Sequence, residues 1–386
     1  MNASDSDGKS FGVYVHVPFC RAPRCAYCDF YSTPVSGSGI DSWLEAVKAE
    51  CSEAHRERFD DCWTVSSIFL GGGTPSLLAP EMISGLLETI LHCWSVAPEA
   101  EISVECNPED IDSHWVAACL DAGVNRLSVG VQSFNSEYLA AIGRCHQPGR
   151  AARALTVARE AGFDRVSADL ILGGPGSSEG IILESVERAL ELGVEHLSVY
   201  GYHLDPPASG YGCAGFNPVD DDAWAGQYLA VCNLLEQHGW RHYEISNWAQ
   251  TDSALCSHNM IYWQRQPYLG LGPSAHSFGP GQVRSANAAD LERWLAAAGS
   301  GEFSAVREVE KLDEDTLACE RVMLGLRLDD GVPLALLEQL HGARAAVELE
   351  NLVRKGLVLA QDGRVRLNDS GFLLFDSIVG HLLPSV

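Results

Sequence analysis

Short apolar runs recur along the first two hundred residues, and each is followed by a stretch with the spacing of an amphipathic helix. An apolar run that ends in Gly, Pro or Asn predicts a buried strand, and a 3.6-residue spacing after it predicts a helix. We expect six strands, at residues 11–17, 66–70, 101–106, 126–132, 165–172 and 196–202. Successive strand-helix units pair in parallel with right-handed crossovers, so the pattern predicts an α/β fold, an open (β/α)6 partial TIM barrel.

The pattern changes beyond the sixth predicted strand. We expect residues 1–10 to be a disordered N-terminus and residues 11–205 to form the barrel core. Residues 206–305 are rich in Pro, Gly, Tyr and Trp around one helical stretch, which indicates a cap of loops and a linker. Residues 306–386 contain helical stretches, a short hairpin and a last helix, so a smaller, winged-helix-like C-terminal domain is expected.

Composition narrows the classes of partner. With 52 acidic and 26 basic residues the net charge is −26, which repels phosphate backbones and anionic lipid, so no nucleic-acid partner is expected. The first ten residues lack the basic start and apolar run of a signal peptide, and no apolar stretch reaches the length of a membrane span. We therefore expect a cytoplasmic protein, in which most of the 13 cysteines are reduced and buried.

Three cysteines stand close together in PFCRAPRCAYCDFYS, namely Cys20, Cys25 and Cys28. Their C-x4-C-x2-C spacing is how a plant-type ferredoxin begins its [2Fe–2S] site, which needs a fourth thiolate. Neither candidate fits well, because Cys51 lies on the apolar face of a predicted helix and Cys62 follows a charged helix end. A three-thiolate site leaves one iron open for a further ligand, as catalytic metal sites do. A [2Fe–2S] ferredoxin-like electron carrier is therefore the weaker alternative.

Six motifs, in order, resemble the radical-SAM proteins of the oxygen-independent coproporphyrinogen III oxidase-like family: YVHVPFC, CAYCDF, LGGGTPSLL, ECNPED, LSVGVQSF and DLILGGPG. A series of this kind is specific, whereas a lone three-cysteine loop would not be. The resemblance implies that Cys20, Cys25 and Cys28 hold a [4Fe–4S] cluster, which in that family reduces S-adenosylmethionine (SAM) to a 5′-deoxyadenosyl radical. The family has three residues between its first two cysteines. This chain has four, and we expect the extra residue, at Pro23, to bulge outward without moving the thiolates.

The resemblance also implies a set of contacts to SAM. Tyr14 and Tyr27 would touch SAM and the iron–sulfur cluster. A glycine-rich turn that ends in Thr74 would receive the amino-acid end of SAM. Taken singly, each position has a purely structural explanation, such as an ordinary turn, a helix cap or a surface ion pair. Their joint order favours a site, whose implied members are Tyr14, Tyr27, Gly72, Gly73, Thr74, Glu105, Gln132, Arg144 and Asp169.

Later segments resemble the HemW-type haem chaperone subgroup of this family, through HYEISNWA, CSHNMIYW and YLGLGPSAHSF. Phe30 stands where the oxidase carries another cysteine, and the oxidase has a longer N-terminal arm. The resemblance implies that His258 binds haem iron. A neutral imidazole is a natural axial ligand, and Tyr262 and Trp263 offer aromatic surface to a porphyrin. The alternative is a purely structural role, in which His258 is a buried, hydrogen-bonded core histidine.

The subgroup implies a protein that binds a [4Fe–4S] cluster, SAM and haem and passes haem to an acceptor protein. We expect it to cleave SAM reductively without coproporphyrinogen oxidase activity, and no residue is assigned as catalytic. Oxygen-independent oxidation of coproporphyrinogen III is the enzyme alternative. The sequence does not decide whether the acceptor is a respiratory protein, whether the chain contacts membrane proteins peripherally, or whether it forms a homodimer. It contains no C-x-x-C-H motif for c-type attachment of haem.

Overall fold

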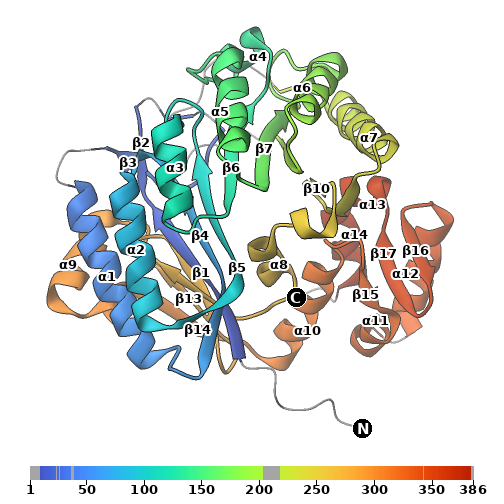
Figure 1. Ribbon diagram of the computed structural model, residues 1–386. Coiled ribbons are helices and arrows are strands. Elements are labelled where there is room, and N and C mark those ends of the chain that lie inside the picture. The colour runs from blue at the N-terminus through green and yellow to red at the C-terminus, as the bar shows by residue number, and fades with distance from the viewer. Residues whose placement is uncertain are drawn as a thin grey trace.

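Six parallel strands form the centre of one twelve-stranded sheet in the computed structural model (Figure 1). The structure describes residues 9–22, 24–25, 27–35, 39–202, 218–341 and 343–383. The six strands pair in chain order, and the sheet does not close on itself, which confirms the open (β/α)6 architecture. They are β1 (Lys9–Val17), β4 (Trp63–Gly72), β5 (Ser95–Cys106), β6 (Arg126–Gln132), β7 (Arg165–Leu172) and β8 (His196–Gly201).

Helices connect these strands and cover one side of the sheet (Figure 1). Several begin at a side-chain cap, as where Asp112 and Ser178 accept hydrogen bonds from backbone N–H groups three residues later. None of the helices within the described ranges is both long and apolar enough to cross a bilayer. The connecting helices are α1 (Gly39–Glu57), α2 (Pro80–Cys93), α3 (Ser113–Asp121), α4 (Ser136–Ala141), α5 (Pro148–Glu160) and α6 (Glu179–Glu191).

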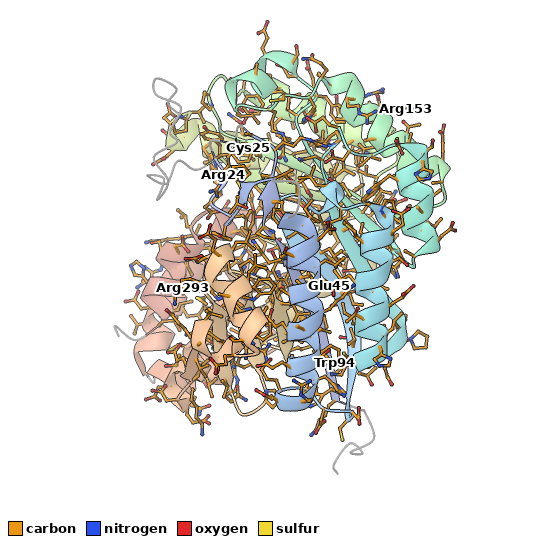
Figure 2. All side chains as sticks on the ribbon, turned by 90° about the vertical axis from the view of Figure 1, so that its left-hand side faces the viewer. Arg24, Cys25, Glu45, Trp94, Arg153 and Arg293 are labelled. Carbon is orange, nitrogen blue, oxygen red and sulfur yellow. The ribbon has the colours of Figure 1, made fainter. Side chains whose placement is uncertain are left out.

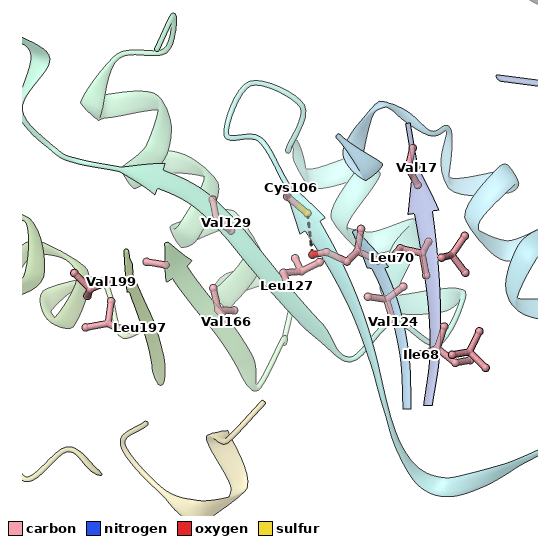
Figure 3. Packing of buried hydrophobic residues seen from close by; sticks show 14 of the residues in the cluster. Val17, Ile68, Leu70, Cys106, Val124, Leu127, Val129, Val166, Leu197 and Val199 are labelled. Carbon is pink, nitrogen blue, oxygen red and sulfur yellow. Dashed lines mark hydrogen bonds between the residues drawn. The ribbon is translucent and has the colours of Figure 1, made fainter. Parts of the chain in front are cut away.

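The core lies against these parallel strands. Figure 3 shows side chains from five of them, all fully buried and all in one apolar cluster: Val17, Leu70, Leu127, Val166 and Leu197. Burying an aliphatic side chain of this size contributes about 1.5–3 kcal/mol. A one-residue slip would turn every one of these side chains to the other face, so packing fixes the register. The carboxyl ends of the six strands therefore meet along one edge. Gly72, Glu105 and Gln132 lie at or next to these strand ends.

Short strands extend the sheet at both edges. The parallel strand β11 (Tyr268–Leu271) pairs with β1 and is followed outward by three antiparallel strands, and β10 and β9 continue the sheet beyond β8. The sequence pattern predicted loops around one helix here, because strands of three to five residues are too short to display alternation. Residues 203–217 lie outside the described part. The further elements are α7 (Asp221–Gln237), β9 (Arg241–Glu244), β10 (Asn247–Ala249), α8 (Ser257–Trp263), β12 (His276–Gly279), β13 (Val283–Asn287), α9 (Leu291–Ser300) and β14 (Arg307–Lys311).

The C-terminal elements form helices followed by a hairpin and two last helices, in agreement with the winged-helix-like prediction. The hairpin turns at Asp362 and Gly363, whose φ angles of 52° and 72° suit the two-residue turns that match strand twist. Glu244 bridges to Leu328 and ties this part to the end of the main sheet. The elements are α10 (Glu314–Gly325), β15 (Val332–Pro333), α11 (Leu334–His341), α12 (Ala343–Arg354), β16 (Val358–Gln361), β17 (Arg364–Leu367), α13 (Asp369–Leu373) and α14 (Phe375–Leu382).

Candidate functional site

Three free cysteines lie in the segment that follows β1. Cys20 belongs to β2 (Phe19–Cys20), which pairs in parallel with β3 (Thr33–Pro34) and so closes the base of the loop. Within the loop the backbone N–H of Cys28 donates to the carbonyl of Cys25 at 3.3 Å, which makes a tight turn. The loop is therefore held at both its base and its tip.

The cysteine loop lies at the carboxyl edge of the sheet. Figure 2 shows Arg24 and Cys25 near the upper end of the molecule, far from Trp94, which immediately precedes β5. The guanidinium of Arg24 donates to the carbonyl of Cys28 at 2.9 Å and so fastens the loop to itself. Pro23, where we expect the extra residue to bulge, lies outside the described residues.

A chain of polar side chains connects two of the thiols. The hydroxyl of Thr74 donates to Sγ of Cys20 at 3.4 Å, and Nδ2 of Asn107 donates to the Thr74 hydroxyl at 3.4 Å. Arg144 completes the chain, with Nη2 donating to Oδ1 of Asn107 at 2.9 Å and Nη1 donating to Sγ of Cys25 at 3.4 Å. Two of the three sulfurs therefore each accept a hydrogen bond from a neighbouring side chain.

The electrostatic surroundings of the Cys28 thiol fit a cationic occupant of the loop. Burial raises the pKa of the Cys28 thiol above its ordinary value, and the neighbouring Cys25 and Cys20 add to that rise against the opposing cation of Arg24. Three thiolates this close repel one another unless a cation lies among them. Because the sulfurs are reduced, adjacent and partly satisfied by donors, the residues present fit an iron–sulfur cluster with three protein ligands.

The glycine-rich turn after β4 lies directly against the chain that leads to Cys20. Gly72 has a φ of 108°, and a Cβ there would lie 2.5 Å from the His16 ring. A Cβ on Gly73 would lie 2.6 Å from the carbonyl oxygen of Phe19, and its N–H donates to the carbonyl of Val17 at 2.8 Å. Only glycine fits these two positions, so the turn brings bare backbone beside the cysteine loop.

Two half-buried carboxyl groups face this edge. Glu105 accepts a hydrogen bond from the N–H of Gly72 at 3.0 Å, and Asp169 accepts from the hydroxyl of Ser128 at 2.9 Å. Burial raises the pKa of Glu105 to about 8, and the charge of Asp169 adds to the rise. Burial likewise raises the pKa of Asp169 to about 6, against the hydrogen bond of Ser128. A pair of mutually repelling carboxylates is complementary to a positively charged ligand.

Tyr14 lies close to this carboxylate pair. Its hydroxyl and Nδ1 of His16 are 3.0 Å apart and hydrogen-bonded. Burial raises the pKa of the Tyr14 hydroxyl well above its ordinary value, and the carboxylate of Glu105 adds to the rise. The structure thus brings Tyr14, Glu105 and the glycine-rich turn to the same part of the edge.

Gln132 and Tyr27 lie at the other end of the site. Gln132 ends β6 with a φ of 63°, a left-handed conformation that side chains other than glycine rarely adopt and that often marks a functional position. Tyr27 packs against Tyr202, with ring centroids 5.9 Å apart, and it hydrogen-bonds to Cys25. Tyr27 therefore lies beside a thiol, while Gln132 lies at the carboxyl end of its strand. As contacts to SAM, both stay predictions.

His258 lies apart from the thiols, in α8. Its side chain is 1% exposed, its Nδ1 is hydrogen-bonded to the Ser67 hydroxyl at 2.7 Å and its Nε2 to the Tyr262 hydroxyl at 2.8 Å. Burial lowers the pKa of the imidazole to about 4, so the ring is neutral near pH 7. Both ring nitrogens are engaged, so this geometry is that of a satisfied core histidine. As an iron ligand His258 stays a prediction, and it requires Tyr262 to turn away.

A buried ion pair that the sequence analysis missed anchors α8. The carboxylate of Glu101 accepts from the backbone N–H groups of Ser257 and His258, each at 3.1 Å. Arg126 pairs with Glu101 at 3.4 Å and donates to the carbonyl of Ala254 at 3.0 Å. Nothing local in the sequence signals this pairing, because the partners come from β5, β6 and the segment before α8.

Further polar residues of the site were missed although their motifs were recognised. The backbone N–H of Asn107 donates to the hydroxyl of Ser76 at 3.0 Å, and that hydroxyl donates to Asp110 at 2.7 Å. Arg21, beside the first cysteine, pairs with Asp110. Asn107 and Asp110 belong to the ECNPED motif and Ser76 to the LGGGTPSLL motif, so for these three the signal was present. They tie the cysteine loop to the two strand ends beside it.

Comparison with protein families supports two parts of this description. Residues 14–189 match the radical SAM superfamily, and residues 312–374 match the HemN C-terminal domain. The first range contains the three cysteines, the glycine-rich turn and both carboxylates. The second covers most of the C-terminal helices and their hairpin.

Relatives match nearly the whole chain. The heme chaperone HemW of Mycobacterium tuberculosis (strain H37Rv) is 38% identical, over 97% of this chain and 95% of its own length, and HemW of Bacillus subtilis is 31% identical, over 96% and 98%. The mitochondrial radical S-adenosyl methionine domain-containing protein 1 of mouse is 34% identical, over 97% and 87%. Among solved structures, coproporphyrinogen III oxidase (HemN) from Escherichia coli has the same fold, with a TM-score of 0.83 at 24% identity, over 97% of this chain and 90% of that one.

Proposed function

Because the chain belongs to the HemW family of radical SAM proteins, we propose that it is a haem chaperone, which binds a [4Fe–4S] cluster, SAM and haem and passes haem to an acceptor protein. The observation that carries the proposal is the identity of 38% over 97% of the chain with a heme chaperone. The arrangement of free thiols, glycine-rich turn and half-buried carboxylates supports the cofactor part of it.

In this proposal Cys20, Cys25 and Cys28 ligate the iron–sulfur cluster. When bound, the cluster supplies the electron with which SAM is cleaved. The chain's own contribution is electrostatic and positional: Thr74 and Arg144 donate to two of the three sulfurs, at 3.4 Å each. These donors lower the cost of keeping the thiolates together in a partly buried loop.

The proposed contacts to SAM divide by chemistry. Gly72, Gly73 and Thr74 offer close backbone approach to the amino-acid end of SAM. Glu105 and Asp169 provide the negative charge that a sulfonium cation and its ammonium group require, and their ionised forms gain from such a ligand. Their oxygens can also accept from ribose hydroxyls. The remaining proposed contacts to SAM or the iron–sulfur cluster are Tyr14, Tyr27, Gln132 and Arg144.

The enzyme alternative, oxygen-independent oxidation of coproporphyrinogen III, is supported by the fold that the chain shares with HemN. Phe30 argues against it. This side chain is 57% exposed on the loop just after Cys28, where the oxidase is expected to carry another cysteine. A phenyl ring cannot supply a thiol to a substrate or a cluster, so that chemistry is absent at this position.

The place of action and the partners follow from the same proposal. A haem chaperone without a spanning helix in its described part fits delivery from the cytoplasm, with haem as cargo and a respiratory haem protein as acceptor. Contact with an acceptor at the membrane would be through that protein, since a net charge of −26 disfavours binding to anionic lipid itself.

An anaerobic titration tests the proposal directly. The reconstituted protein is titrated with haem, and the same preparation is assayed for consumption of coproporphyrinogen III in the presence of SAM and a reductant. The proposal predicts saturable binding of haem with a shifted Soret band and no consumption of coproporphyrinogen. Robust formation of protoporphyrinogen without haem binding would establish the oxidase instead.

A further inference from the structure

An aromatic pocket of about 570 Å³ lies beside the cysteine loop, within the ~300–1,000 Å³ range of ligand sites. Its walls come from β1, from the residues just after Cys28, from α8 and the strands β11 to β13, and from α10 of the C-terminal part. Flat aromatic rings dominate these walls and suit a planar macrocycle. They include Tyr14, Phe30, Tyr31, Tyr262, Trp263, Tyr268 and Phe278.

One histidine of the aromatic pocket has a free ring. His276, at the start of β12, is exposed, and no hydrogen bond of its imidazole occurs among the residues that the structure describes. His16 also lines the pocket, but its Nδ1 is bonded to Tyr14 and its Nε2 is 2.8 Å from the carbonyl oxygen of Tyr31. His258 lies one side chain behind the wall, bonded to Tyr262. Of the three, His276 alone offers a nitrogen to iron without rearrangement.

The backbone around His276 is built to hold it there. A Cβ on Gly270 would lie 2.1 Å from the carbonyl oxygen of His276, so glycine is required where β11 crosses the start of β12. Ser274, which also lines the pocket, has a φ of 65° in the turn between these strands. The turn thus presents His276 to the pocket at the cost of a conformation that serine rarely adopts.

Two arginines supply positive charge in a chain that is strongly acidic. Arg265 is 9% exposed in its side chain, has a φ of 54°, and pairs with Glu320 at 3.1 Å, while its Nη2 has no partner among the described residues. Arg284 pairs with Glu310 and Glu320, each at 2.7 Å. Asp29 and Glu320 also line the pocket, so the charge of the pocket is mixed.

The unpartnered donors point to a ligand with acceptor oxygens. The indole Nε1 of Trp263, like Nη2 of Arg265, is buried without a partner in the described part of the chain. A buried donor left without an acceptor costs about 1–3 kcal/mol, which a ligand carboxylate reaching it would recover. An aromatic macrocycle that carries two carboxylates and a metal would use the rings, the arginines and the free imidazole together.

We infer that the aromatic pocket is the haem site, with His276 as the axial ligand to iron and Arg265 and Arg284 as the partners of the two propionates. The inference rests on the proposed function and adds the location of the haem and the residues that hold it. It places the haem against the loop that carries Cys28, with Tyr14 as a wall common to the pocket and the proposed SAM site.

The first experiment compares three histidine variants of the reconstituted full chain by titration with haemin under anaerobic conditions. His276→Ala should shift the Soret band and weaken haem binding by at least about tenfold, and added imidazole should restore the band. His258→Ala tests the ligand that the family resemblance implies. If His276 is the ligand instead, this variant keeps the wild-type band, because both nitrogens of His258 are already bonded to Ser67 and Tyr262. His92→Ala, on the exposed end of α2, is the matched control.

The outcomes distinguish failure of the ligand assignment from failure of the proposed haem-chaperone function. An unchanged band and affinity in His276→Ala, or the loss of the wild-type band in His258→Ala with rescue by imidazole, would overturn the assignment while leaving a haem chaperone in place. If the wild-type protein bound no haem at all, the proposed function and the pocket assignment would fall together.

The second experiment tests the propionate contacts with haemin and its dimethyl ester, which lacks the two negative charges. The wild-type protein should bind haemin more tightly than the ester, and Arg265→Gln should reduce that difference, because the side chain that distinguishes the ligands is gone. Equal affinity of the wild-type protein for the two ligands would contradict the role of the arginines.

Discussion

Replacing Arg126 by Met should lower the free energy of unfolding by about 3–5 kcal/mol, because it leaves a buried carboxylate without its cation. The side chains of Arg126 and Glu101 are 2% and 1% exposed, so water cannot replace the lost partner. Arg126 also donates to the carbonyl of Ala254 at 3.0 Å, and that acceptor would lose its charged donor. Glu101 would keep the backbone N–H groups of Ser257 and His258, which places the loss below that of an isolated buried charge.

Urea unfolding followed by tryptophan fluorescence measures the effect. Arg188→Met is the matched control, because Arg188 pairs with Glu191 on a surface where the side chains are 48% and 65% exposed, and such pairs contribute about 0–1 kcal/mol. The double variant of Arg126→Met with Glu101→Gln should recover part of the loss, since the unpaired charge is removed. A loss in Arg126→Met no larger than in Arg188→Met would refute the claim that this pair anchors α8.

Three further predictions concern the cofactor site. Replacing Cys20, Cys25 or Cys28 by Ala should abolish the binding of about four irons by reconstituted protein, whereas Cys51→Ala should not, and a [2Fe–2S] Mössbauer spectrum would contradict the three-thiolate site. The raised pKa of Glu105, about 8, means that the folded state binds a proton that the unfolded state releases near its ordinary value. The free energy of unfolding without SAM should therefore fall as pH rises from about 4.5 to 8, and Glu105→Gln should flatten that fall in urea titrations at several pH values; an unchanged slope would count against the shift. Reduced protein with SAM should release 5′-deoxyadenosine slowly, as chromatography would detect, and its absence would argue that SAM is bound without being cleaved.

The strands of the barrel were predictable because their physics is local. A parallel strand buried on both faces is a continuous apolar run, and the predicted residues 126–132 and 165–172 are the observed bounds of β6 and β7. The expectation that Cys51 is a core residue is also confirmed, since it is fully buried and its Sγ lies 3.7 Å from that of Cys93.

The features that the sequence did not reveal depend on residues far apart in the chain. Arg126 pairs with Glu101 on the neighbouring strand and also bonds to Ala254, more than a hundred residues later in the chain. The spacing of apolar residues gives no sign of these contacts. The free ring of His276 becomes informative only beside the engaged rings of His16 and His258. For His258 the motif identified the segment, but only the three-dimensional structure showed that both ring nitrogens are hydrogen-bonded.

Haem transfer tests the central claim most directly. The haem-loaded protein is mixed with increasing amounts of the haem-free form of a b-type respiratory haem protein, and the movement of haem is followed by the change in the Soret band. A chaperone that delivers its cargo in a complex with the acceptor should transfer haem at a rate that rises with acceptor concentration and then saturates. A rate equal to passive release at every acceptor concentration would contradict the account.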